Sequence, residues 1–338
     1  MNKKILLKKK QGFKYSIILI DGIFGSGKTL LAQIMSTYKN VQNQSIDYSF
    51  DNITALNYLK KLDDQSSSQL LKIISDENFF NYEIGRKINL RVFDHTGIKD
   101  NPHYKEDINK IFINKEKKVL KSVDKKNKTQ TIMGHNIFLN YNLLKKTFKN
   151  KLTLIVCVRH PVFMFRHSFN YFFNLHKSKK NFTIYIKNKK KEMPWYYFKI
   201  FDKFSNKHGD NILLLFNYLF NEIKKYSKEK HFLPVNFEQM VKKPHRFLNI
   251  IEKQRSLEKN KILLKEAFDR TNIYRKNINK GITFNKYGIS DTGRSSKNFY
   301  LKELRFIKKN ISKHNYKLLN KIILNYNKNW PSIFKAYE

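Results

Sequence analysis

The sequence predicts an α/β fold of three layers, an open parallel sheet with helices on both faces. Short apolar runs rich in β-branched residues alternate along the chain with longer segments of helical periodicity. Two of these runs, residues 17–20 and 152–158, are almost entirely apolar, which is typical of strands buried on both faces. The first run leads through a glycine-rich turn directly into a helical segment. We expect a basic tail over residues 1–15 and one domain over residues 16–338.

The glycine-rich turn has the spacing of a phosphate-binding loop, Gly22-x-x-x-x-Gly27-Lys28-Thr29, so the predicted fold is of the P-loop type. Glycines let the backbone curl so that successive N–H groups point inward, and the start of the helix adds the positive end of its dipole. Lys28 supplies a mobile positive charge, and Thr29 supplies a hydroxyl for a phosphate oxygen or a metal. The residues expected to bind phosphate are Gly25, Ser26, Gly27, Lys28 and Thr29.

The chain between this loop and the second apolar run is less regular. Residues 40–82 are polar and mixed, and we expect helices and loops there. Residues 89–94 are predicted to form a strand that ends in Asp94-x-x-Gly97. Three further segments are expected, in chain order a solvated lysine-rich excursion over 114–129, a short strand over 131–135 and a helix over 139–148.

The second half of the chain opens with the predicted strand over 152–158, which ends in Arg159-His160-Pro161. Pro161 is suited to the first turn of a helix, which is expected over residues 162–175. The remaining predicted elements are a helix over 195–204, strands over 211–216 and 231–238, helices over 239–251 and 262–268, a loop over 280–296, and two C-terminal helices with Trp330 packed at their end.

Composition and charge limit the classes of partner. With 338 residues, 41% of them hydrophobic, the chain can bury a large core. The net charge of +41 would suit a nucleic acid, an acidic glycan or an anionic membrane surface. The lysines are spread along the whole chain, however, and no RNA-binding motif is present, which argues against a specific nucleic-acid partner. The abundance of Lys, Asn, Ile and Phe together is also what an AT-rich coding sequence would produce.

The single cysteine, Cys157, lies inside a predicted strand, so disulfides and a cysteine-based zinc site are excluded. No stretch approaches the roughly 18 apolar residues that a membrane-spanning helix needs. The lysines at the start of the chain precede an apolar run that is short and interrupted by Asp21. We therefore expect a cytoplasmic protein without a transmembrane segment, with peripheral contact to acidic lipid left open.

A second cluster follows the strand over 152–158. An arginine at the carboxyl edge of a parallel sheet points into the ligand crevice of an open α/β fold, as Arg159 is expected to do. Its planar guanidinium could hold a second phosphate away from the glycine-rich loop. The alternative is that Arg159 caps the sheet edge or pairs with a carboxylate.

With these two elements the chain resembles the sulfotransferases that use 3′-phosphoadenosine 5′-phosphosulfate. In that family the loop after the first strand holds the 5′-phosphosulfate, and an Arg-x-Pro strand end followed by a helical serine holds the 3′-phosphate. Arg159-His160-Pro161 and Ser168 resemble the second element, and residues 233–244 resemble the family's strand that ends in Tyr-Glu-Asp-Leu. The resemblance implies that Arg159, Ser168 and, in the loop expected to close over the nucleotide, Arg294 bind the donor.

A third element, Met133-Gly134-His135, resembles the glycan 2-O-sulfotransferases. In those enzymes the histidine of a Gly-His pair accepts the proton of the acceptor hydroxyl. The resemblance implies that His135 is the general base, a role that suits an imidazole because it titrates near neutral pH. It also implies that Lys28 stabilises the negative charge that builds on the bridging oxygen as the sulfuryl group departs, that no metal is needed, and that the acceptor is a hydroxyl of a glycan or of another compound.

Two departures from the family keep an ATP-dependent enzyme open as the alternative. The family places a lysine before the glycine of its loop, whereas Lys28 follows Gly27 in the pattern of an ATP-type loop. Ser168 also lies one position later than in the family, where His167 takes its place. In a kinase, Asp94 could hold Mg²⁺, Gly97 could contact the γ-phosphate, and Arg159 and Arg166 could be lid arginines. A GTPase is disfavoured because the guanine-reading Asn-Lys-x-Asp segment is missing.

Overall fold

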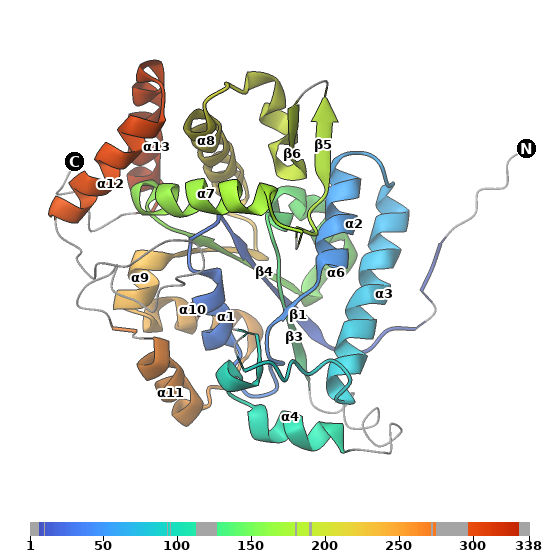
Figure 1. Cartoon of the computed structure of the whole chain (residues 1–338). Helices are drawn as coiled ribbons and strands as arrows, with labels where there is room; N and C mark the ends of the chain where they lie inside the picture. Colours follow the sequence, from blue (N-terminus) through green and yellow to red (C-terminus); the bar gives the residue numbers. More distant parts are fainter. Residues whose placement is uncertain are drawn as a thin grey trace, which may run out of the picture.

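The computed structural model describes residues 7–9, 11–92, 94, 96–112, 127–179, 181–188, 191–271, 273–274 and 297–330. Its centre is a five-stranded sheet in the order β2-β3-β1-β4-β7, and all neighbouring strands run parallel (Figure 1). The open parallel sheet predicted from the sequence is thus confirmed. The strands are β1 (Ser16–Gly22), β2 (Ser45–Ile46), β3 (Thr129–Met133), β4 (Leu152–Val158) and β7 (Phe232–Asn236).

The two most apolar runs of the sequence are neighbours in the middle of this sheet. β1 pairs with β4 from Ile17 opposite Leu152 to Gly22 opposite Cys157. Every residue of β4 is buried, which is why its sequence lacks the alternation of a half-exposed strand. Burial raises the pKa of the Cys157 thiol to about 12, so this side chain acts as a packing residue. In the sheet, β3 lies on one side of β1 and β4 lies on the other. The carboxyl end of β1 is therefore at the point where the strand order reverses.

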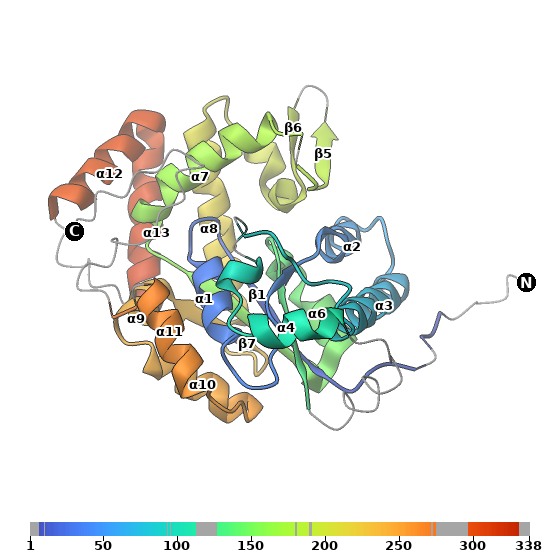
Figure 2. The ribbon, with the colours of Figure 1, turned by 60° about the horizontal axis from the view of Figure 1, so that its bottom comes forward.

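Helices lie on both sides of the sheet. α3 packs on α6 on one side, and α1 packs on α11 on the other, as both views show (Figures 1 and 2). The helices are α1 (Lys28–Met35), α2 (Tyr48–Tyr58), α3 (Asp64–Glu83), α4 (Tyr104–Ile111), α6 (Tyr141–Phe148), α7 (Pro161–His176), α8 (His208–Tyr226), α9 (Phe237–Lys242), α10 (His245–Arg255), α11 (Lys261–Thr271), α12 (Lys297–Asn310) and α13 (Tyr316–Asn329), with 3₁₀ turns η1 (Ile98–Asp100), η2 (Ile137–Asn140), η3 (Lys149–Lys151) and η6 (Lys313–Asn315).

Several helices agree with the sequence predictions. α7 covers the expected segment after Pro161, and α12 and α13 are the two expected C-terminal helices, with Trp330 buried at their end. The helix expected over 239–251 is divided into α9 and α10 because Pro244 interrupts it. None of the helices in the described ranges is long and apolar enough to cross a membrane.

Two predicted strands are wrong. Residues 211–216 belong to α8, because the apolar positions continue with helical spacing to Ile223 and a short apolar run does not distinguish helix from strand. Residues 89–92 form no strand, and Leu90 and Val92 are half exposed. The edge of the sheet beside β3 is instead supplied by the two residues of β2.

A small antiparallel hairpin, which the sequence did not predict, lies outside the main sheet. It consists of β5 (Tyr185–Asn188) and β6 (Lys191–Pro194), in a part of the chain rich in lysine. The segment after it, expected as a helix, is a 3₁₀ helix, η4 (Trp195–Lys203), whose first three aromatic side chains are buried. Figure 1 places this hairpin next to one end of α2.

Candidate active site

The predicted phosphate-binding loop joins β1 to α1 and has the backbone that its glycines allow. Gly22, Gly25 and Gly27 have φ values of 143°, 78° and 100°, in a region that side chains with a Cβ atom rarely adopt. A Cβ at Gly27 would lie 2.4 Å from the ring of Phe237, and one at Gly25 would lie 3.0 Å from the ring of His167. The loop is therefore enclosed by residues of α9 and α7, and only glycine fits at these two positions.

Two side chains of the loop differ in their surroundings. Ser26 is fully buried, and within the described part of the chain its Oγ has no hydrogen-bond partner. Thr29 Oγ1 lies 4.0 Å from the sulfur of Met133, on the neighbouring strand. A buried hydroxyl without a partner is costly unless a ligand or water satisfies it, so Ser26 is suited to bind an oxygen atom inside the loop.

Lys28 is the first residue of α1 and folds back over the loop. Its Nζ donates a hydrogen bond of 2.8 Å to the carbonyl of Gly22 and lies 5.1 Å from the ring centre of Phe24. Burial lowers the pKa of Lys28, and the nearby carboxylate of Asp21 opposes this shift. The ammonium group is thus held where a phosphate on the loop would meet it.

The buried carboxylate of Asp21 links the loop to the next strand. It accepts hydrogen bonds from the N–H groups of Gly22, Asn136 and Phe138, at 2.7, 2.9 and 2.9 Å. Burial raises the pKa of the Asp21 carboxyl, while the ammonium of Lys28 and the three N–H donors lower it. Asp21 therefore fixes the turn that follows β3 relative to the phosphate-binding loop.

That turn carries His135, whose side chain is held by the first turn of α2. Nδ1 of His135 lies 2.7 Å from Oδ2 of Asp51, and its ring stacks on Tyr48 at 5.7 Å with an angle of 7° between the planes. Asp51 also interacts electrostatically with Lys28 of the loop, so the pair of Asp51 and His135 lies near the loop. The sequence analysis proposed His135 but did not name Asp51 or Tyr48, because a lone acidic or aromatic residue in a mixed segment carries no motif.

Arg159 lies at the end of β4, at the same edge of the sheet. Its Nη1 donates a hydrogen bond of 3.1 Å to the carbonyl of Gly25, and its guanidinium lies 4.4 Å from the ring centre of Phe237. Arg159 thus lies beside the loop, and its predicted role in holding a second phosphate stays a prediction. The neighbouring Glu238 is buried and accepts hydrogen bonds from His160 N at 2.9 Å and Tyr326 OH at 2.7 Å.

Other predicted site residues lie in different surroundings. Ser168 is fully buried, with its Oγ 3.5 Å from the carbonyl of Phe24. Asp94 accepts hydrogen bonds from the N–H and hydroxyl of Thr96, both at 3.1 Å, within its own turn. Arg166 pairs with Glu303 at 2.9 Å and so joins α7 to α12. Arg294 lies outside the described residues.

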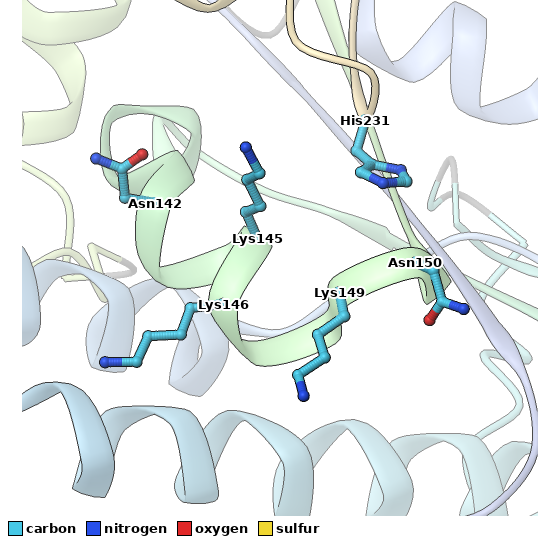
Figure 3. Close-up of a pocket in the computed structure, with 6 residues that line it drawn as sticks. All are labelled: Asn142, Lys145, Lys146, Lys149, Asn150 and His231. Atoms are coloured by element: carbon cyan, nitrogen blue, oxygen red, sulfur yellow. The ribbon is translucent and has the colours of Figure 1, made fainter.

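A cavity of about 480 Å³ lies at the other end of the sheet (Figure 3). Its residues come from α6 and from the segments that precede β4 and β7, whereas the phosphate-binding loop follows the carboxyl end of β1. Lys145 pairs with Glu229 and Lys146 with Asp64. The lining residues are Asn142, Lys145, Lys146, Lys149, Asn150 and His231.

Comparison with known proteins gives distant likenesses in structure only. No protein-family model matches the chain, and no curated protein matches its sequence. Mouse sulfotransferase SULT7A1 complexed with PAP is 13% identical, with 96% of this chain and 88% of that chain covered and a TM-score of 0.41. The sulfotransferase domain of the Synechococcus PCC 7002 olefin synthase is 12% identical, with 90% of this chain and 98% of that chain covered and a TM-score of 0.37. The sulfotransferase domain of the curacin biosynthetic pathway is 10% identical, with 92% of this chain and 98% of that chain covered and a TM-score of 0.40. Likeness at this level does not carry an activity over to this chain.

Replacing the buried carboxylate should destabilise the fold. In Asp21→Asn the amide nitrogen must face one of the three N–H donors, so we expect a loss of about 1–3 kcal/mol in the free energy of unfolding, measured in urea. The control Asp64→Asn removes an exposed carboxylate that pairs with Lys146 and should change stability by less than about 1 kcal/mol. Equal stability of Asp21→Asn and the wild type would contradict the bridging role.

His167 should make stability depend on pH. Burial, with the positive charges of Arg159 and Lys28, lowers its pKa from 6.5 to about 4. The unfolded chain therefore binds a proton at a higher pH than the folded chain does, and stability falls as the pH decreases from 6.5 to 4. At about 1.4 kcal/mol per pKa unit, this group accounts for about 3 kcal/mol over that interval.

The measurement compares urea unfolding of the wild type and His167→Gln at several pH values between 4 and 7. The other nine histidines are common to both proteins, so the difference between the two curves isolates His167. We expect the variant to lose less stability on acidification. Parallel curves for the two proteins would show that His167 is not protected from protons in the folded state.

Proposed function

We propose that this protein is a sulfotransferase that moves a sulfuryl group from 3′-phosphoadenosine 5′-phosphosulfate to a hydroxyl group. The observation that carries the proposal is the combination of a phosphate-binding loop bearing Lys28 with a carboxylate-oriented histidine, His135, joined through one buried residue, Asp21. A phosphate cradle alone would suit many enzymes. A histidine oriented by a carboxylate beside such a cradle suits removal of a proton from an attacking hydroxyl.

In this proposal the loop holds the 5′-phosphosulfate. The N–H groups of residues 25–29 and the buried hydroxyl of Ser26 would bind its oxygens, since the start of α1 favours a negative charge there. Arg159 would hold the 3′-phosphate through its guanidinium group, and Arg294 would add a second positive charge. The hydroxyl of Ser168 supports the carbonyl of Phe24 and so the shape of the loop.

The reaction needs positioning and charge stabilisation more than covalent chemistry on the protein. The acceptor oxygen forms a bond to sulfur as the bond from sulfur to the bridging phosphate oxygen breaks. His135 takes the proton of the acceptor hydroxyl, and Lys28, on its flexible stem, moves from the Gly22 carbonyl to the bridging oxygen. The products are a sulfate ester and adenosine 3′,5′-bisphosphate, with no step that requires a metal.

The acceptor side of the site is aromatic. Tyr48, which stacks on His135, also contacts Phe182 with ring centres 5.1 Å apart, and the two side chains are 38% and 57% exposed. Exposed ring faces beside a base can pack on the apolar face of a sugar. A glycan hydroxyl is therefore our proposed acceptor, which the Gly-His resemblance also favours.

An ATP-dependent kinase is the second candidate, because the sequence Gly22–Thr29 is a complete ATP-type loop. Its proposed metal ligand, Asp94, uses its carboxylate to close its own turn at Thr96. A kinase would therefore require this turn to open or another residue to bind Mg²⁺.

Ligand titration separates the two candidates. The melting temperature of the protein would be followed with adenosine 3′,5′-bisphosphate without metal and, separately, with ATP and Mg²⁺. A ligand at 100 times its dissociation constant adds about 2.7 kcal/mol to stability. We expect stabilisation by the bisphosphate without metal. Stabilisation by ATP and Mg²⁺ alone would overturn the sulfotransferase proposal and favour the kinase.

The role of Arg159 can be tested with two nucleotides that differ only in the 3′-phosphate. We expect Arg159→Ala to weaken binding of adenosine 3′,5′-bisphosphate by about 1.5–3 kcal/mol, measured by calorimetry, and to leave binding of 5′-AMP nearly unchanged. Equal losses for both ligands would show that the arginine acts only by supporting Gly25. The control Arg166→Ala, on α7, breaks the pair with Glu303 and should not alter either affinity.

A further inference from the structure

We infer that the first turn of α2 is the support of the catalytic base, and that Asp51 is a positioning residue that fixes which nitrogen of His135 accepts the proton. This inference rests on the proposed function, in which His135 is the base. It adds a residue that the sequence motifs did not indicate, from the helix that also carries Tyr48.

The contact between Asp51 and His135 has two components. Oδ2 of Asp51 lies 2.7 Å from Nδ1 of the ring, and Oδ1 accepts the main-chain N–H of His135 at 3.3 Å. Asp51 is 5% exposed, so water does not compete strongly for its oxygens. An ionised carboxylate only accepts hydrogen bonds, so Nδ1 must carry the proton of the neutral ring. The lone pair is then on Nε2, which is the nitrogen left to remove a proton from an acceptor.

The ring is also held in its plane. Tyr48 and Asp51 lie three residues apart on α2 and so on the same face of the helix, where one stacks on the ring and the other binds its edge. The start of this helix is fixed by Asp47, whose side chain accepts the N–H of Ser49 at 2.9 Å. Further along α2, the carbonyl of Thr54 accepts a hydrogen bond of 3.2 Å from Asn140, at the end of η2. α2 is thereby attached to the turn of His135 at two points.

The carboxylate has a second consequence during the reaction. When Nε2 takes the acceptor's proton the ring becomes an imidazolium, and the negative charge of Asp51 2.7 Å away stabilises it. The proton on Nδ1 stays on the ring throughout the reaction, so the carboxylate of Asp51 balances the charge of the imidazolium and does not itself take up a proton. The alternative is that Asp51 only ties α2 to the turn and has no influence on the ring.

The tautomer of His135 distinguishes these two roles. The full-length protein, labelled with ¹⁵N in its histidines and saturated with adenosine 3′,5′-bisphosphate, would be studied by NMR at alkaline pH. His135→Gln identifies the signal of this ring among those of the ten histidines. In the wild type we expect a neutral ring protonated at Nδ1. A wild-type ring protonated at Nε2 overturns the inference without any variant having to fold.

Asp51→Asn provides the second measurement. The main-chain N–H of His135 requires an acceptor, so the amide oxygen takes that position and the amide nitrogen faces Nδ1. In Asp51→Asn we expect the ring proton to move from Nδ1 to Nε2. We expect the same in Asp51→Ala, where Nδ1 loses its hydrogen-bond acceptor. Retention of the Nδ1 proton in both variants overturns the inference.

Matched controls separate this result from a general loss of structure. Asp47→Asn changes the same residue type on the same helix, keeps a good N-cap and contacts Asn78 and Lys87 instead of His135. It should leave the Nδ1 tautomer unchanged, as should Tyr48→Leu. Asp47→Asn and Tyr48→Leu should also bind adenosine 3′,5′-bisphosphate within about twofold of the wild type, because both keep Asp51, the carboxylate of α2 that interacts electrostatically with Lys28. If the wild type did not bind adenosine 3′,5′-bisphosphate at all, this result would count against the proposed function and not against the role of Asp51.

Discussion

The rest of the site depends on one buried carboxylate at the end of the central strand. Removing a charge from water is costly unless it is paired and hydrogen-bonded, and Asp21 meets this cost with three N–H donors and the nearby ammonium of Lys28. Two of those donors belong to Asn136 and Phe138, far along the chain. The glycine-rich loop and the turn that carries His135 are consequently held as one unit, as the proposed reaction between two bound molecules would require.

The loop owes its shape to neighbours as much as to its own glycines. Phe237 occupies the space beside Gly27, and His167 occupies the space beside Gly25. Arg159 lies between these neighbours, on the ring of Phe237 and against the carbonyl of Gly25. Because the ends of β1, β4 and β7 all reach the same edge of the sheet, these contacts are a direct result of the parallel strand order. The edge gathers positive charge next to the buried hydroxyl of Ser26, which has no hydrogen-bond partner among the residues that the structure describes, a combination suited to phosphate oxygens.

Where sequence reasoning went wrong, the reason is that local patterns are ambiguous. The apolar run over 211–216 fits a buried strand as well as a buried helix, and only its packing within α8 decides. Residues 89–92 have strand-like composition, but Leu90 and Val92 are half exposed, and the sheet edge beside β3 is supplied by the two residues of β2. The hairpin of β5 and β6 was missed because its strands are short and rich in charge.

The sequence alone determined the α/β class, the glycine-rich loop before α1, and the arginine at the end of β4, since each depends on residues next to one another in the chain. Only the tertiary structure decided the surroundings of His135. Asp51 lies 84 residues before it, and the two meet because α2 packs on the turn that follows β3. No periodicity or spacing encodes such a contact, because it depends on how separate elements pack over the sheet and not on the backbone of either one.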